Sequence, residues 1–106
     1  MAPTGAENFW NLRGQRIGFR DDDSLRTPEG LEIARFYEKE LYGPDGRYMG
    51  EVVEEGRLAR KNTSCGKTRD KFLSTHHKTN FDLVISDQPA RALPVGFNDF
   101  PHPDEA

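Results

Sequence analysis

Short apolar stretches alternate with polar turns along the first two thirds of the chain, and the alternation repeats every 16 residues. One position of this period holds Gly14, Gly30, Gly46 and, in the fourth unit, Asn62. Four residues further on, a small residue follows an apolar one; these small residues are Gly18, Ala34, Gly50 and Gly66. A unit of this length cannot bury its own apolar face, so the pattern predicts four copies packed around a shared core.

The third unit indicates which structure each copy forms. An apolar pair precedes a turn made of Pro44, Asp45 and Gly46, and an apolar stretch at 48–53 follows the turn. Pro fixes one turn dihedral, Asp hydrogen-bonds its own backbone, and Gly accepts a positive φ, so this composition favours a tight turn between strands. Each unit is therefore predicted to be a hairpin. The predicted fold class is all-β: four short hairpin-like repeats that form a small pseudo-fourfold ring or barrel.

The second unit, residues 27–41, is open to two interpretations. Thr27 followed by Pro28 is typical of a helix start, because Thr caps a helix and Pro fits its first position. Apolar residues at helical spacing follow. Against a helix, Gly30 would lie in its first turn, and the apolar residues at 33–36 keep the phase of the strands in the other units. We favour a strand here and keep a short helix near 27–41 as the alternative.

The fourth unit departs most from the pattern. Asn62 replaces glycine, and we expect a left-handed backbone there because Asn tolerates that conformation best after Gly. Cys65 takes the position that Ile17 and Met49 occupy in other units, which predicts a buried structural thiol. A single cysteine excludes an internal disulfide framework and is typical of a reducing, cytoplasmic compartment.

The chain is expected to contain one domain with extensions. Residues 1–8 are interpreted as a flexible lead, residues 9–72 as the β-repeat domain, and residues 73–106 as a strand plus a proline-rich tail that is packed on the domain or disordered. The strand is expected at 81–85. Two phenylalanines are suited to hold the tail against this chain or a neighbour: Phe97 and Phe100.

The composition predicts a small core. Leu, Ile, Val and Phe make up about a fifth of the 106 residues, so aromatic side chains must fill much of the interior. No apolar run approaches the roughly 20 residues that cross a bilayer. The first residues lack the basic region and the apolar stretch of a secretory signal. We therefore expect a cytoplasmic protein with no membrane partner.

Charge is distributed unevenly along the chain. The net charge is −3, yet residues 57–78 carry seven basic residues and a single acid, Asp70. Such a stretch is typical of an anion-binding face or of a contact between oppositely charged copies, although a solvated loop balanced elsewhere is the more ordinary interpretation. The candidate anion- or partner-binding residues are Arg57, Arg60, Lys61, Lys67, Arg69 and Lys71.

Few residues are candidates for catalysis or metal binding. Zinc sites require paired ligands at short spacing, and one cysteine with the adjacent His76 and His77 does not provide them. A nucleophile pair of Cys65 with a histidine would have to form across space. We therefore predict no catalytic residue and no metal ligand.

Two further motifs are incomplete. Residues 64–68 end like a phosphate-binding loop, but the glycine that such a loop needs five residues before Gly66 is replaced by Lys61. The acidic run at 21–24 lacks the central glycine and the distal glutamate of a calcium loop. Neither motif predicts a site, and we expect no cofactor.

The repeat resembles the bacterial four-fold β-flower domain, a small all-β unit built from four hairpin-like petals. The likeness covers residues 9–72 and is carried by Phe9, Trp10, Gly14, Ile17, Gly18 and Phe19, by Gly30, Ile33, Ala34 and Phe36, and by Leu41, Tyr42, Gly46, Met49, Gly50, Glu51 and Val52. The segment 88–94 is also similar to the tail of such proteins, whereas the helix-like stretch at 27–41 departs from the pattern. The resemblance implies a fold but no established activity, so it assigns no site residue.

These observations predict a non-enzymatic interaction or assembly module whose partner is another protein or a second copy of the chain. The alternative is a polyanion- or nucleic-acid-binding module that uses residues 57–78. The acidic remainder and the pI near 5.6 disfavour it, because phosphate binding needs a favourable field. A second alternative is a small enzyme that uses Cys65 with His76 or His77.

Overall fold

The computed structural model describes residues 7–76 and 86–101. Within these residues the chain forms strands, one short 3₁₀ turn and no α-helix. The strands are β1 (Asn8–Asn11), β2 (Arg16–Asp21), β3 (Ser24–Arg26), β4 (Glu32–Tyr37), β5 (Glu40–Tyr42), β6 (Tyr48–Glu54), β7 (Arg57–Lys61) and β8 (Phe97–Asp99), and the 3₁₀ turn is η1 (Asn62–Ser64). The strand predicted at 81–85 and most of the predicted flexible lead lie outside the described residues.

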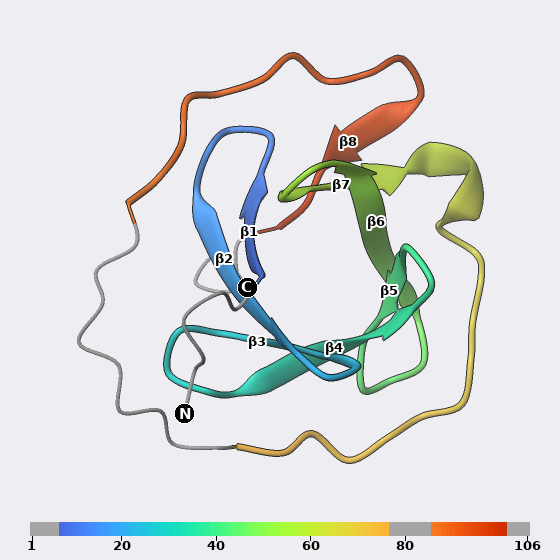
Figure 1. Ribbon diagram of the computed structural model, residues 1–106. Helices are drawn as coiled ribbons and strands as arrows, with labels where there is room; N and C mark the ends of the chain where they lie inside the picture. The colour runs from blue at the N-terminus through green and yellow to red at the C-terminus, as the bar shows by residue number, and fades with distance from the viewer. Residues whose placement is uncertain (1–6, 77–85, 102–106) are drawn as a thin grey trace.

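The first seven strands form a closed barrel, which Figure 1 shows down its axis. Successive strands pair antiparallel from β1 to β7, and β1 then pairs with β7 in parallel. This closing seam is short, because it pairs Trp10 with Arg57 and Asn11 with Leu58. β8 is an extra strand that runs antiparallel to the second half of β7. The predicted all-β ring or barrel is confirmed.

Three wide turns share one geometry at intervals of 16 residues. Gly14, Gly30 and Gly46 have φ values of 94°, 99° and 82°. In each turn the glycine N–H donates to the carbonyl three residues earlier, at 2.8 to 3.1 Å. The left-handed backbone predicted for Asn62 is wrong, since Asn62 begins η1 and has no positive φ. The chain leaves the barrel here instead of returning as a further hairpin.

Residues 27–41 form a turn and strands, so the short-helix alternative is wrong. Burial alternates residue by residue along β4, the period-two pattern of a strand with one face on the core. Thr27 uses its capping chemistry in the turn: its Oγ1 accepts the Leu31 N–H at 3.2 Å, and its carbonyl accepts the Gly30 N–H at 2.8 Å. The local signal of Thr followed by Pro therefore marks a turn.

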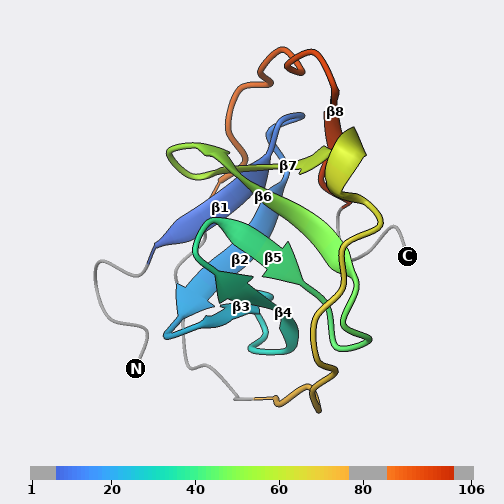
Figure 2. The ribbon, with the colours of Figure 1, turned by 90° about the vertical axis from the view of Figure 1, so that its right-hand side faces the viewer.

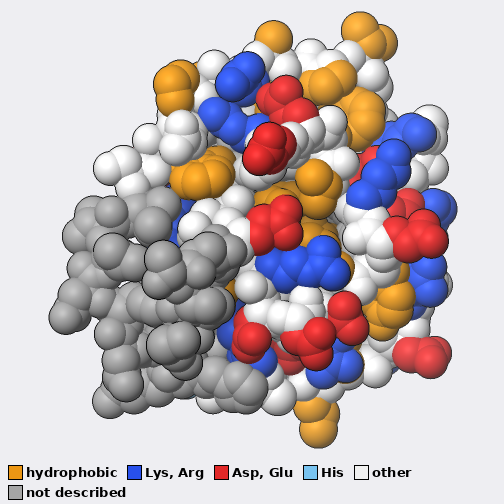
Figure 3. All heavy atoms as spheres, viewed as in Figure 1, with side chains coloured by type: hydrophobic (Ala, Val, Ile, Leu, Met, Phe, Trp, Pro, Cys, Tyr) orange, Lys and Arg blue, Asp and Glu red, His pale blue; other side chains and the backbone are white. Residues whose placement is uncertain are grey.

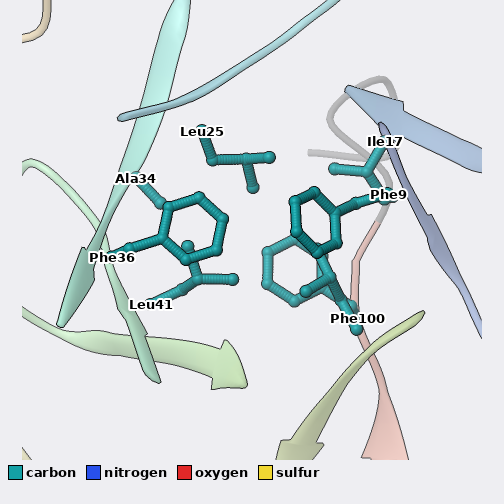
Figure 4. Packing of buried hydrophobic residues seen from close by; sticks show 8 residues of the cluster. Phe9, Ile17, Leu25, Ala34, Phe36, Leu41 and Phe100 are labelled. Carbon is teal, nitrogen blue, oxygen red and sulfur yellow. The ribbon is translucent and has the colours of Figure 1, made fainter. Parts of the chain in front are cut away.

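The barrel interior is filled by side chains from nearly every strand and from the residue after β8 (Figure 4). The buried core residues are Phe9, Ile17, Leu25, Ala34, Phe36, Leu41, Leu58 and Phe100. Phe9 and Phe36 lie with ring centroids 5.4 Å apart. Phe100 is fully buried and takes the space beside Gly50, where a Cβ would come within 2.6 Å of its ring. Phe100 therefore lies inside the barrel core, whereas the sequence suggested that it packs on a surface.

The segments 67–76 and 86–91, which we call the strap, run around the outside of the barrel (Figure 1). They hydrogen-bond the wide turns in reverse order. At the third turn the Arg69 N–H donates to the Gly46 carbonyl at 2.7 Å; at the second, the Glu32 N–H donates to Thr75 at 2.8 Å; at the first, the Gln88 N–H donates to Gly14 at 2.8 Å. The glycines permit this approach, since a Cβ on Gly14 would lie 1.8 Å from the Gln88 carbonyl oxygen.

The two ends of the barrel consequently differ. The wide turns at 12–15, 27–31 and 43–47 lie at one end, which we call the strapped end. The tight turns at 22–23, 38–39 and 55–56 lie at the opposite end, together with the residue that precedes β1; we call this the short-turn end. Figure 2 shows the tight turns pointing to the left, away from the part of the strap that follows η1.

Candidate binding groove at the barrel seam

The short-turn end is acidic. Among the described residues, the exposed charged side chains on its tight turns and just before β1 include a single base, Lys39. The exposed acids are Glu7, Asp22, Asp23, Glu38, Glu54 and Glu55. Figure 3 looks onto this end, and acidic side chains lie around the centre of the face. Arg20, from the end of β2, covers the Phe36 ring at 4.4 Å and lies 3.6 Å from Asp23.

Trp10 lies at the closing seam and is held there on two sides. Its indole Nε1 donates to the Ser86 carbonyl at 2.9 Å, so the strap fixes the orientation of the ring. Its backbone N–H donates to the Gly56 carbonyl at 2.7 Å. The ring lies over Gly56, where an added Cβ would come within 3.4 Å of two ring carbons. Trp10 is only partly buried and is the single tryptophan of the chain.

A groove of about 500 Å³ opens beside this ring. Its walls come from three parts of the chain: the start of β1, the β6–β7 turn and the strap. The parallel seam pairs β1 with β7 through Trp10 and Asn11, so the start of β1 and the β6–β7 turn are free to diverge toward the short-turn end. We call this hollow the Trp10 groove; its charged lining residues are Glu7, Glu54, Glu55, Arg57 and Arg91.

The charges of the Trp10 groove differ in how they are used. Arg57 is buried, and its guanidinium donates to the Asn11 carbonyl at 3.2 Å and to the Pro89 carbonyl at 2.8 Å. By contrast, the carboxylates of Glu54 and Glu55 are exposed, with no hydrogen bond or ion pair to other residues of the described chain. The two exposed carboxylates are therefore available to a ligand, whereas the buried Arg57 guanidinium already donates its hydrogen bonds to backbone carbonyls.

Three of the six basic residues singled out from the sequence hold the seam or the strap through their side chains. Arg57 holds the seam, as described above. Lys67 Nζ lies 2.7 Å from the Glu40 carboxylate, and this hydrogen bond lowers the pKa of Glu40. Arg69 covers the Tyr37 ring at 4.3 Å and the Tyr42 ring at 5.2 Å. These contacts attach the strap and the seam to the barrel.

The other three basic residues have no role in common. Arg60 is partly buried, its Nε has no hydrogen-bond partner within the described chain, and its guanidinium approaches the Cys65 sulfur at 3.7 Å. Lys61 and Lys71 are exposed. The structure thus distributes the predicted basic stretch over β7, η1 and the strap, and Lys78 lies outside the described residues.

The prediction of a buried structural thiol at Cys65 is wrong, because the residue is exposed. It follows η1, where the chain has left the barrel, so its place in the 16-residue period no longer corresponds to a strand position. Its sulfur lies 3.6 Å from the Lys61 carbonyl. His76 forms an isolated bridge with Leu31, and His77 lies outside the described residues. No group of three or more metal-ligating residues is found in the described part of the chain.

A buried carboxylate fastens the strap to the second wide turn. Burial would raise the pKa of Glu32, but hydrogen bonds from Arg35, Ser24 and the Thr75 backbone outweigh it and lower the pKa to about 2. The Arg35 Nε and the Ser24 hydroxyl donate to Oε2 at 2.9 and 2.5 Å, and the Thr75 N–H donates to Oε1 at 3.1 Å. Glu32 is therefore a structural anion at neutral pH.

Of the residues that line the groove, the sequence singles out Arg57 alone, as one of the six basic candidates. In the sequence, Trp10 stands out only as part of the repeat pattern, and Glu54 and Glu55 belong to no candidate motif. The local signal was present in part, as two acids directly before the glycine of a tight turn. The sequence does not show the pairing of β1 with β7 that places Trp10 next to that turn, because the two are far apart along the chain.

Comparisons with protein-family models, with curated proteins and with solved structures gave no match. The resemblance to bacterial four-fold β-flower domains therefore stays a prediction. Within residues 7–76 and 86–101, no helix has the length and apolar character needed to cross a membrane.

Proposed function

We propose that the protein is a non-enzymatic interaction module that binds a basic protein surface through its short-turn end. The observation that supports this most is the exposed acidic residues there, among which Glu54 and Glu55 have no partner within residues 7–76 and 86–101. Charges that do not serve the fold are free to pair with another molecule, and a surface dominated by one sign attracts the opposite one.

The polyanion-binding alternative has less support. Its basic residues were expected to act together, but Arg57 donates to backbone carbonyls, Lys67 pairs with Glu40, and Arg69 covers two tyrosine rings. Using these residues for phosphate binding would break contacts that hold the seam and the strap. Lys61 and Lys71 remain exposed, which is a small number of cations for a salt-dependent phosphate contact.

A calorimetric titration distinguishes these functions. A short peptide of alternating lysine and arginine, without tryptophan, is titrated into the full chain at low and at physiological salt, and a single-stranded oligonucleotide is titrated in parallel. We expect the peptide to bind at low salt and to weaken as salt rises, because exposed charges are screened. Binding of the oligonucleotide without binding of the peptide would contradict the proposal.

Self-association belongs to the same proposal, because the exposed Lys61 and Lys71 of one copy are cationic partners for the acidic end of another. Sedimentation across a concentration series measures self-association. An assembly that dissociates as the salt concentration rises supports a second copy of the chain as the partner.

A cytoplasmic location is likewise proposed, supported by the exposed free thiol of Cys65, which suits a reducing compartment. The enzyme alternative, Cys65 with a histidine, has no contact that supports it among the described residues.

A further inference from the structure

We infer that the Trp10 groove binds one lysine or arginine side chain of a partner's basic peptide segment, with its cationic head against the indole ring and the carboxylates of Glu54 and Glu55. This inference rests on the proposed function and locates its central contact. It assigns a role to residues that the fold alone does not explain.

The indole ring is organised before any ligand binds. The hydrogen bond from Nε1 to Ser86 holds the polar edge of the ring, and its benzene part lies beside Gly56. The groove then runs along the ring. A fixed aromatic surface binds a cation more tightly than a mobile one, because no side-chain entropy is lost on binding, and tryptophan is the best aromatic partner for a cation.

The lining of the groove favours a cation over an anion. Three carboxylates and two guanidinium groups line it, and one of the guanidinium groups, that of Arg57, is buried and donates to two backbone carbonyls. Glu54 ends β6 and Glu55 begins the β6–β7 turn, directly before Gly56, beside which the Trp10 ring lies. A cationic head at the ring would therefore meet two carboxylates that have no competing partner in the part of the chain that the structure describes.

The size of the groove fits a side chain better than a small ion. A volume of about 500 Å³ lies within the range of ligand pockets, roughly 300 to 1,000 Å³. A long aliphatic stem with a charged head fills such a space while its stem packs on the indole. Arg91 on the strap lines the same groove, so we expect one cationic head of a basic segment, and not two, to enter it.

Fluorescence tests this inference directly, because Trp10 is the only tryptophan and reports from the groove itself. The same tryptophan-free lysine–arginine peptide is titrated into the full chain at low salt, with a glutamate-rich peptide as the charge-reversed probe. We expect a saturable change in Trp10 emission with the basic peptide alone. The double variant Glu54→Gln with Glu55→Gln should weaken binding about five- to tenfold, as expected for loss of two exposed charge contacts.

The matched control is Glu38→Gln, which removes an exposed carboxylate from an equivalent tight turn outside the groove. We expect it to change the affinity less than about twofold. If calorimetry shows peptide binding that Glu38→Gln weakens and the double variant does not, the groove inference is wrong and the proposed function stands. If no basic peptide binds at low salt, both are wrong. A Trp10 response to the glutamate-rich peptide would also overturn the inference.

Discussion

The strapped end and the short-turn end of this barrel use their polar groups in opposite ways. At the strapped end, turn carbonyls and N–H groups pair with the strap, and Glu32 receives hydrogen bonds from three residues. At the short-turn end, the turns are as short as two residues and their carboxylates face solvent. One end holds the fold together, and the other leaves its charges free for another molecule.

The contrast separates stability from binding. Buried or hydrogen-bonded polar groups cost free energy when they are removed, because their partners are left unsatisfied. Exposed, unpaired carboxylates contribute little to stability. Substitutions at the strapped end should therefore lower the free energy of unfolding, whereas substitutions at the short-turn end should change affinity and leave stability alone.

The largest of the effects predicted here is a loss of stability at the third wide turn. Gly46→Ala places a Cβ 2.2 Å from the Arg69 carbonyl oxygen and at a φ of 82°, so both the backbone and the strap must shift. We expect the free energy of unfolding to fall by about 3 kcal/mol, the sum of left-handed strain and overpacking. Urea denaturation measures it.

Gly96→Ala is the control for that change. Gly96 has a similar φ of 85° but nothing within 4 Å of the added carbon, so it carries the conformational cost alone. We expect a loss of about 1 kcal/mol. Equal losses of unfolding free energy for the two variants would mean that close contact with the strap adds nothing to the cost at Gly46.

The second prediction is that the contribution of Glu32 to the free energy of unfolding depends on pH. Its pKa is lowered from 4.5 to about 2, so the stability that it supplies is fully present above pH 4.5 and is lost as the pH falls toward 2. A difference of this size corresponds to about 3 kcal/mol as an upper estimate. Glu32→Gln should therefore be strongly destabilising at pH 7. The difference in the free energy of unfolding between this variant and the unmodified protein should become smaller in acid. A difference that stays constant between pH 7 and pH 2 would show that Glu32 is not the anchoring anion.

The smallest effect is expected at the short-turn end. Replacing Glu54 and Glu55 together by Gln should change the free energy of unfolding by less than about 0.5 kcal/mol, because neither carboxylate has an intramolecular partner in the described chain. Thermal unfolding of the double variant checks this. A loss above 1 kcal/mol would mean that these carboxylates serve the fold, and the two ends would no longer differ.

Local chemistry in the sequence predicts much of the fold. Glycines 16 residues apart mark the three wide turns, because only glycine accepts the positive φ that those turns require without strain. The alternation of apolar and polar residues around them is enough to predict strands and hence an all-β ring. The region at 27–41 shows the limit: Thr27 and Pro28 supply helix-start chemistry to a turn, and the packing of Ala34 and Phe36 in the core decides for a strand.

The candidate site depends on contacts that local sequence does not encode. The seam brings Trp10 beside Arg57, and the strap brings Ser86 to the indole, each across a long separation in the chain. The same reason explains the wrong expectation for Cys65. A period identifies equivalent positions only while the chain stays in the barrel, and the chain leaves it at η1. Nor does a run of basic residues reveal that Arg57, Lys67 and Arg69 already have partners.

A ¹H–¹⁵N NMR titration with the lysine–arginine peptide tests the division between the two ends most directly, because every backbone amide and the Trp10 indole N–H report separately. The account predicts shifts that concentrate at the Trp10 indole and at the β6–β7 turn, with the strap amides of Arg69 and Thr75, which lie outside the groove, unchanged. Shifts that concentrate on the strap and leave the Trp10 indole unmoved would contradict it.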